Sequence, residues 1–217
     1  MSIEFSILNK CVSVTAKRAS GKSQLIRYIV GQERDKFEKI FVICPTEVVN
    51  HFYSEIVEPN CIFDEWSEEW AEDLIKQMTE INSKRNEDKK ERKNVLLLLD
   101  DCMADTNFGQ SKALKKLYQR GRHINISVLA TCQYIYNLPP PARNNTDFCI
   151  VGQMNRQSVQ LLADEYLSGG LAKEDFIDLY NKATVDYGFL VINCTSVKDN
   201  EIDSIYGIMK TPSEYVV

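Results

Sequence analysis

Residues 11–32 read CVSVTAKRASGKSQLIRYIVGQ, and this stretch decides the fold. Its centre, AKRASGKS at residues 16–23, matches the phosphate-loop pattern GxxxxGK[ST], except that Ala16 stands at the first glycine position. An apolar, strand-like run precedes the loop and a helical pattern follows it, which is the context that the pattern requires. We therefore predict a loop that binds the phosphates of a nucleoside triphosphate at the start of a helix. The alternative is a chance GKS at a helix start.

The backbone N–H groups of such a loop point inward at the phosphates. Gly21 permits the tight backbone path, Lys22 is predicted to reach the β- and γ-phosphates during catalysis, and Ser23 is predicted to ligate Mg²⁺. The departure at Ala16 is modest, because that position closes the loop and does not touch phosphate. The predicted nucleotide contacts are Ala16, Lys17, Arg18, Ala19, Ser20, Gly21, Lys22, Ser23 and Gln24.

The segment NVLLLLDD, residues 94–101, is an almost wholly apolar strand that ends in two carboxylates. In phosphate-loop NTPases, a carboxylate at the end of such a strand holds the magnesium ion. Asp100 fits this role, and Asp101 can orient and deprotonate the attacking water. Two adjacent acids place the predicted catalytic carboxylate where the additional-strand catalytic-glutamate class has it, although this aspartate is one methylene shorter. The alternative is a strand that simply ends in a polar turn.

A later strand-like run, ISVLATCQ at residues 126–133, also ends in a polar side chain. In this class of ATPase, the position after that strand carries a sensor of the γ-phosphate or of the attacking water. Gln133 is the candidate. Taken alone, a glutamine that follows a strand is an ordinary loop residue.

Along the rest of the chain, short apolar runs alternate with helical patterns. Strands are expected at residues 11–16, 39–44, 94–101, 126–131 and 147–152, and helices at residues 23–32, 55–80, 111–122, 157–166 and 173–182. Residues 187–195 and 202–210 predict a C-terminal β-hairpin or a pair of edge strands. A strand that is apolar on both faces belongs in the middle of a parallel sheet. We therefore predict a three-layer α/β fold with a mostly parallel central sheet, in one domain over residues 1–217.

Composition fits a globular chain of 217 residues, with 44% hydrophobic and 26% charged residues and a net charge of −5. The seven cysteines are scattered and never spaced as CxxC, which favours free, structural thiols in a reducing compartment. The N-terminal residues lack the pattern of a signal peptide, and no run approaches the ~20 apolar residues of a membrane span.

Six motifs, in a fixed order along the chain, make the resemblance to a known family specific. They are KRASGKS (17–23), CPTE (44–47), LLLLDDC (96–102), GRHINIS (121–127), ATCQ (130–133) and LPPPARNNTD (138–147). Together they resemble the FtsK–HerA superfamily of DNA-translocating ATPases, which have a RecA/FtsK-like fold. More narrowly, they resemble the poxvirus-type genome-packaging ATPases of large DNA viruses and virophages. The resemblance runs from about Cys11 to Thr195. The family usually has glycine where Ala16 and Ala19 stand.

This resemblance implies an ATP-driven, Mg²⁺-dependent motor that moves double-stranded DNA into a capsid. It implies that Arg122 acts in the neighbouring subunit's site as an arginine finger, with Arg143 and Arg156 in reserve. A finger supplied in trans implies a homo-oligomeric ring, a pentamer or a hexamer, and a capsid or portal component is a further expected partner. The protein is then expected in the host cytoplasm or in the virion. From sequence alone, the preferred interpretation of Arg122 is a cation at a helix C-terminus that satisfies the last carbonyls.

A motor of this kind grips the DNA backbone through Lys and Arg side chains without reading bases. The candidate contacts are residues 84–93 and the basic residues of one predicted helix, namely Lys112, Lys115, Lys116 and Arg120. Such charge runs are also ordinary solvated faces. Two other functions stay open: a cellular or plasmid HerA/FtsK-like DNA translocase, and a nucleotide-binding scaffold with little turnover. The paired Asp100 and Asp101 oppose the scaffold, because a pure switch needs only the metal-binding acid.

Overall fold

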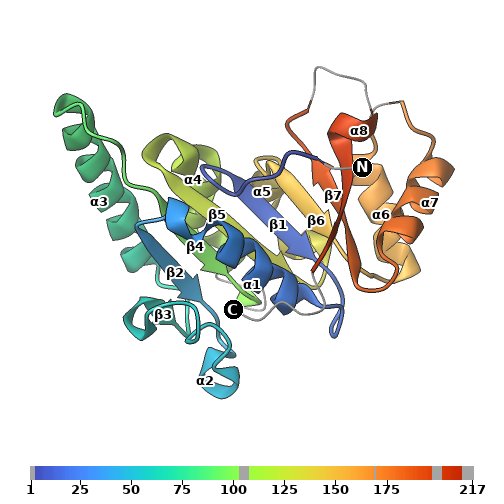
Figure 1. Ribbon diagram of the computed structural model, residues 1–217, viewed down its shortest axis with the longest axis horizontal. Helices are drawn as coiled ribbons and strands as arrows, with labels where there is room; N and C mark the ends of the chain where they lie inside the picture. The colour runs from blue at the N-terminus through green and yellow to red at the C-terminus, as the bar shows by residue number, and fades with distance from the viewer. Residues whose placement is uncertain (1–2, 103–107, 169, 197–201, 212–217) are drawn as a thin grey trace.

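An eight-stranded sheet forms the centre of the computed structural model, which describes residues 3–102, 108–168, 170–196 and 202–211 (Figure 1). The strand order is β3-β2-β4-β5-β1-β6-β7-β8. The strands are β1 (Cys11–Thr15), β2 (Lys39–Ile43), β3 (Ile62–Phe63), β4 (Val95–Leu99), β5 (Ile126–Cys132), β6 (Phe148–Val151), β7 (Gly188–Asn193) and β8 (Tyr206–Lys210). Strands β1 to β6 are parallel, whereas β7 is antiparallel to β6 and β8 is antiparallel to β7. The predicted, mostly parallel sheet is confirmed, and the two C-terminal strands extend it in antiparallel fashion, with β8 at its edge.

Helices cover both faces of this sheet. They are α1 (Lys22–Glu33), α2 (Glu47–Asn50), α3 (Glu68–Glu87), α4 (Lys112–Arg120), α5 (Pro140–Arg143), α6 (Arg156–Tyr166), α7 (Lys173–Ala183) and α8 (Ile202–Ile205). Short 3₁₀ turns lie at Arg34–Lys36, Pro59–Cys61, Phe108–Gln110, Gly121–Ile124 and Ile135–Asn137. Because α8 and other residues separate β7 from β8, these two strands do not form a tight hairpin, and of the two it is β8 that lies at the edge of the sheet. The expectation that residues 1–217 form one domain stays a prediction.

The alternating side chains of β4 show how the three layers form. Leu96 and Leu98 pack in the same buried cluster as the apolar side of α1, whereas Leu97 and Leu99 pack with α3 and α4. Helices α6 and α7 cover β6 and β7 in a third cluster. Every residue of β4 is at most 3% exposed, as expected for a strand covered on both faces. The core therefore fixes β4 at the middle of the sheet and holds its carboxyl end in place.

One helix prediction was wrong at its start. Residues 55–80 were expected to form a single acidic helix, but α3 begins only at Glu68 and continues to Glu87. Pro59 lies in a 3₁₀ turn, and Ile62 and Phe63 then pair with β2 as the short edge strand β3. The Ser67 side chain caps α3 by accepting a hydrogen bond from the Trp70 N–H group. The acidic composition of the segment thus gave no indication that it contains a turn, a short strand and the start of the helix.

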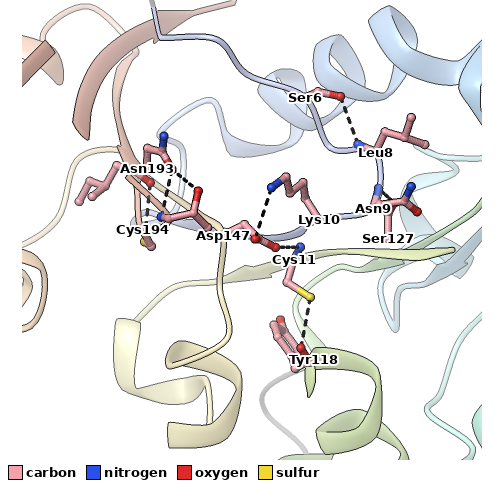
Figure 2. A network of polar contacts seen from close by, with 12 residues as sticks. Ser6, Leu8, Asn9, Lys10, Cys11, Tyr118, Ser127, Asp147, Asn193 and Cys194 are labelled. Carbon is pink, nitrogen blue, oxygen red and sulfur yellow. Dashed lines mark hydrogen bonds and ion pairs between the residues drawn. The ribbon is translucent and has the colours of Figure 1, made fainter. Parts of the chain in front are cut away.

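The two ends of the parallel strands carry different chemistry. The phosphate loop and the residues that follow β4 and β5 lie at the carboxyl ends of the parallel strands, which we call the carboxyl edge of the sheet. At the opposite, amino edge, Asp147 joins three strands (Figure 2). Its Oδ2 accepts a hydrogen bond from the Cys11 N–H at 2.8 Å, its own N–H donates to the Cys11 carbonyl at 2.7 Å, and its carbonyl accepts from the Cys194 N–H at 2.8 Å. Lys10 Nζ lies 3.6 Å from Asp147 Oδ1.

All seven cysteines carry free thiols, and all except Cys194 are buried. Burial raises the pKa of Cys149 to about 11, so its thiol is protonated at neutral pH. Among the described residues, no helix has both the length and the apolar composition needed to cross a membrane.

Candidate functional site

The phosphate loop lies between β1 and α1, at the centre of the carboxyl edge. Two of its residues have left-handed backbone, Ala19 with φ +57° and Gly21 with φ +83°. The loop is anchored at its start, where the Ala16 N–H donates to the Cys132 carbonyl at 3.2 Å and the Lys17 N–H donates to the Gln153 carbonyl at 2.9 Å. Ser20 Oγ closes it by donating to the Lys17 carbonyl at 2.7 Å. The loop therefore follows a tight, anchored path, with Lys17 to Ala19 exposed.

The side chain of Lys22 folds back across this loop. Its Nζ donates to the Ala16 carbonyl at 3.0 Å, which places the ammonium group over the loop at the start of α1. Ser23 and Gln24 stand in the first helical turn, Ser23 half-buried and Gln24 exposed. The unpaired N–H groups of a helix start and its positive dipole end attract anions. Lysine, loop and helix thus present positive charge toward one region.

The alanine at the first loop position is accommodated by a glycine opposite. A Cβ placed on Gly152 would come 2.9 Å from the Cβ of Ala16 and 2.7 Å from the ring of Phe189. Ala16 is completely buried. The methyl group of Ala16 therefore fits because residue 152 has no side chain.

Asp100 directly follows β4, and both of its carboxylate oxygens accept hydrogen bonds. Thr131 Oγ1 donates to Oδ1 at 2.5 Å, and the Tyr53 hydroxyl donates to Oδ2 at 2.8 Å. Burial, and then the negative charge of Asp100, raise the pKa of Tyr53 well above its usual value, so its hydroxyl remains a donor. Each oxygen keeps acceptor capacity, because an ionised carboxylate offers about four lone-pair sites.

Asp101 and Gln133 are in contact, although 32 residues separate them in the sequence. Gln133 Nε2 lies 3.1 Å from Asp101 Oδ2 and 3.3 Å from Oδ1, so the amide donates to the carboxylate. The backbone of Asp101 is left-handed, with φ +54°, and its N–H donates to Thr131 Oγ1 at 3.0 Å. Left-handed backbone in a non-glycine residue is disfavoured and occurs where the surroundings hold it, often at functional sites.

Sequence reasoning missed Thr131 and Tyr53. The signal for Thr131 was the strand register, because Leu99 pairs with Ala130 and the next residues along, Asp100 and Thr131, are therefore neighbours. Tyr53 had no local signal, since it lies in the irregular segment after α2 and reaches Asp100 only through the tertiary fold.

Arg122 lies on the 3₁₀ turn after α4, at the amino edge, and is exposed. The pKa of the Cys11 thiol is raised to about 12, first by burial and then by the Asp147 carboxylate, while the nearby Arg122 cation acts against both. Cys11 is the first residue of β1, and the phosphate loop follows the last. Arg122 therefore lies at the opposite end of this strand from the phosphate loop of its own chain.

The two reserve arginines differ in how free they are. Arg143 is held within the chain: its Nε lies 3.1 Å from Glu165, one guanidinium nitrogen donates to the Leu138 carbonyl at 2.7 Å, and the guanidinium carbon lies 4.6 Å from the ring centroid of Tyr136. Arg156 begins α6 at the carboxyl edge and is exposed.

The predicted DNA contacts are spread over two surfaces. On α4, Lys112 and Arg120 are exposed and Lys115 is half-buried, while Lys116 forms an ion pair with Glu72 of α3 at 2.8 Å. In the second group, residues 84–93, Lys90 pairs with Asp88 and Lys93 pairs with Glu38. Ion pairing neutralises part of both surfaces, and their contact with DNA stays a prediction.

Known proteins provide two kinds of comparison. In sequence, the chain is 32% identical over 191 residues to the uncharacterized protein 075L of Invertebrate iridescent virus 6, covering 87% of this chain and 72% of that protein. In structure, it is similar to the genome packaging NTPase B204 of Sulfolobus turreted icosahedral virus 2, with a TM-score of 0.63, 17% identity and coverage of 94% and 98%. The pCW3 conjugation coupling protein TcpA gives a TM-score of 0.59 at 15% identity, with coverage of 87% and 58%.

These structural similarities, at such low identity, establish a shared fold. The sequence comparison establishes more than the fold, because it shows the family. The profile of the Poxvirus A32 protein matches residues 8–209, which confirms the resemblance inferred from the motifs: the chain belongs to the Poxvirus A32 protein family.

Proposed function

We propose that this protein is an ATPase that drives double-stranded DNA into a viral capsid. The observation that carries the proposal is the pair of carboxylates after β4, in which Asp101 is held by Gln133 and Asp100 by Thr131 at the same edge of the sheet as the phosphate loop. A scaffold that only binds nucleotide has no need of the second carboxylate. Family membership and the fold shared with the genome packaging NTPase B204 support DNA packaging as the task.

The residues present fit ATP with Mg²⁺. Ser23 Oγ and Asp100 would supply the hard oxygen ligands that magnesium prefers, since such sites hold the ion through one or two carboxylates together with substrate phosphates. Mg²⁺, when bound, neutralises charge on the β- and γ-phosphate oxygens. Lys22 would exchange the Ala16 carbonyl for phosphate oxygens, a short movement because its ammonium already lies over the loop.

Asp101 is proposed to accept the proton of the attacking water. Its carboxylate lies one residue beyond the metal-binding Asp100, and the Gln133 amide restricts its orientation. Gln133 can also donate a hydrogen bond to the water or to the γ-phosphate, so its position links the sensor to the base. Positioning and electrostatic stabilisation of this kind supply most of the catalysis in phosphoryl transfer.

Arg122 is proposed to act on the site of a neighbouring copy, in a ring. Its exposed position at the amino edge, away from its own phosphate loop, supports action in trans. It is preferred to Arg143, whose guanidinium is already engaged by Glu165 and the Leu138 carbonyl. An arginine finger stabilises the charge that develops on the transferred phosphoryl group.

The experiment that tests the function is ATP hydrolysis with and without linear double-stranded DNA, at low and moderate salt. DNA should stimulate the wild-type protein, and added salt should weaken the stimulation because backbone contacts release counterions. Asp101→Asn should retain ATP binding and lose turnover by at least about 100-fold, the contribution typical of a general base. Lys22→Ala serves as the control that loses ATP binding as well.

Two results would count against the proposal. Undiminished turnover by Asp101→Asn would remove this residue as the base. Hydrolysis that is indifferent to DNA at every salt concentration would oppose a motor that grips the DNA backbone.

A further inference from the structure

Tyr187 combines two unusual properties. The residue is 67% exposed, which is high for a large aromatic residue. Its backbone is left-handed, with φ +57°, and so is that of the preceding Asp186, with φ +51°. Side chains disfavour this conformation because Cβ crowds the following carbonyl oxygen. Such backbone persists where the surroundings impose it, and it clusters at functional sites.

The surroundings do impose it here. Asp186 and Tyr187 are the central residues of a turn that the Gly188 N–H closes by donating to the Val185 carbonyl at 3.0 Å. The chain is also crowded immediately after the turn, where a Cβ on Gly188 would come 2.2 Å from the Ala183 carbonyl oxygen. The turn therefore holds Tyr187 in one place at the start of β7.

The turn is connected to the phosphate loop through hydrogen bonds of Gln153. Gln153 Nε2 donates to the Thr184 carbonyl at 3.2 Å, and the Gln153 carbonyl accepts from the Lys17 N–H at 2.9 Å. The ring of Tyr187 lies against the loop itself, since a Cβ on Gly21 would come 3.4 Å from Tyr187 Cδ1. Because β7 is antiparallel to β6, its first residue lies at the carboxyl edge, beside the loop (Figure 1).

The strand order sets the direction in which a nucleotide extends from the loop. Asp100 and Asp101 follow β4, on one side of β1, so the γ-phosphate must point to that side. The nucleoside end then extends to the other side, over β6 and β7, where Tyr187 presents an exposed aromatic face. An aromatic ring offers a nucleobase a large apolar surface on which to stack.

We propose that Tyr187 stacks on the nucleobase of the bound nucleoside triphosphate. This inference rests on the proposed function, because it takes the phosphate loop to bind ATP. The strained turn then has a role: it holds the ring at the edge of the site before the nucleotide arrives, so that little ordering is required on binding.

The test compares a ligand that has a base with one that lacks it. We would measure the equilibrium affinities of ATP and of inorganic tripolyphosphate, both with Mg²⁺, for the wild-type protein, Tyr187→Ala, Tyr187→Phe and Lys22→Ala. Tyr187→Ala should weaken ATP binding by about 5- to 100-fold, the range of base–aromatic stacking, and leave tripolyphosphate binding unchanged. Tyr187→Phe keeps the aromatic face and should bind ATP almost as the wild type does.

The control is Val185→Ala, which removes another exposed side chain of the same turn and should change neither affinity. Wild-type ATP affinity in Tyr187→Ala would overturn the inference alone, and so would equal weakening of both ligands, since that indicates a disturbed phosphate loop. Failure of the wild-type protein to bind either ligand would overturn the proposed function and the inference with it. The expected pattern is that Lys22→Ala loses the binding of both ligands, whereas Tyr187→Ala binds only ATP more weakly.

Discussion

At the scale of single residues, Thr131 links the two carboxylates that follow β4. Its hydroxyl donates to Asp100 Oδ1 at 2.5 Å and accepts from the Asp101 N–H at 3.0 Å. Thr131→Val keeps the shape and removes both hydrogen bonds. We expect kcat to fall by about 10- to 100-fold with a small change in KM for ATP, because misplacing a catalytic group is costly. Steady-state ATPase kinetics measures this.

Thr131→Ser is the matched control, since it keeps the hydroxyl group and should restore most of kcat. Urea unfolding of the valine variant should show a loss of about 1–2 kcal/mol, because the Asp101 N–H loses its partner. A variant of lowered stability whose kcat stays at the wild-type value would assign Thr131 a purely structural role.

Residues at the site differed in how readable they were from the sequence. Lys22, Asp100 and Gln133 stand at fixed places in motifs or at strand ends, and in the structure Gln133 donates a hydrogen bond to Asp101. Thr131 needed the register between β4 and β5, and Tyr187 needed the contact between a distant turn and the phosphate loop. Long-range geometry of this kind leaves no local pattern.

At the scale of elements, Glu68 of α3 fixes the start of α4. Its Oε1 accepts from the N–H groups of Lys112 and Ala113 at 2.9 and 2.8 Å, and its Oε2 accepts from Ser111 Oγ. A carboxylate at a helix start satisfies free N–H groups and complements the helix dipole. This contact fixes the start of the helix that leads into the turn carrying Arg122.

Glu68 gives a pH-dependent prediction. Burial raises the pKa of its carboxyl group, but the hydrogen bonds that it accepts, led by that from Ser111, outweigh burial and hold the pKa below its usual range. A carboxyl group whose pKa is lowered in the folded state stabilises the fold at pH values above its unfolded pKa of about 4.3. This stabilisation is lost as the pH falls through the folded pKa. Glu68→Gln should therefore cost about 1–2 kcal/mol at pH 7, and its difference from the wild type should shrink below pH 4.

Thermal or urea unfolding between pH 7 and pH 3 measures this difference. Glu72→Gln is the control on the same helix, because its exposed ion pair with Lys116 should contribute less than about 1 kcal/mol. A Glu68→Gln penalty that stays constant down to pH 3 would contradict the assignment.

The elements themselves were largely predictable. Apolar runs located all the long strands, because buried parallel strands need continuous apolar sequence. The start of α3 was missed because acidic residues occur in turns and in helices alike, and because β3 is only two residues long and is defined by its pairing with β2. Short elements of this kind depend on partners and not on local propensity.

At the scale of the whole molecule, the phosphate loop and Arg122 lie at opposite ends of β1. If Arg122 acts in trans, mixing Arg122→Ala with Lys22→Ala subunits should restore activity that neither variant has alone. Random mixing in equal amounts should give roughly a quarter of the wild-type rate, since half of the sites keep Lys22 and half of these face an intact finger. ATPase assays across mixing ratios measure the recovery.

Lys22→Ala mixed with Asp101→Asn is the matched control, because both changes affect the same site and no mixture contains a complete one. Recovery in this control would point to contamination or to residual activity. No recovery at any ratio of Arg122→Ala to Lys22→Ala would place Arg122 outside the neighbouring site.

Stacking on the exposed ring of Tyr187 affects which nucleoside triphosphate the protein hydrolyses. Stacking uses the flat face of a base and makes no demand on the hydrogen-bonding groups along its edge. The Tyr187 contact therefore favours purines over pyrimidines through area alone and separates adenine from guanine only weakly. Where this contact governs the choice of nucleotide, the relative concentrations of the triphosphates in the infected cell decide which one is hydrolysed.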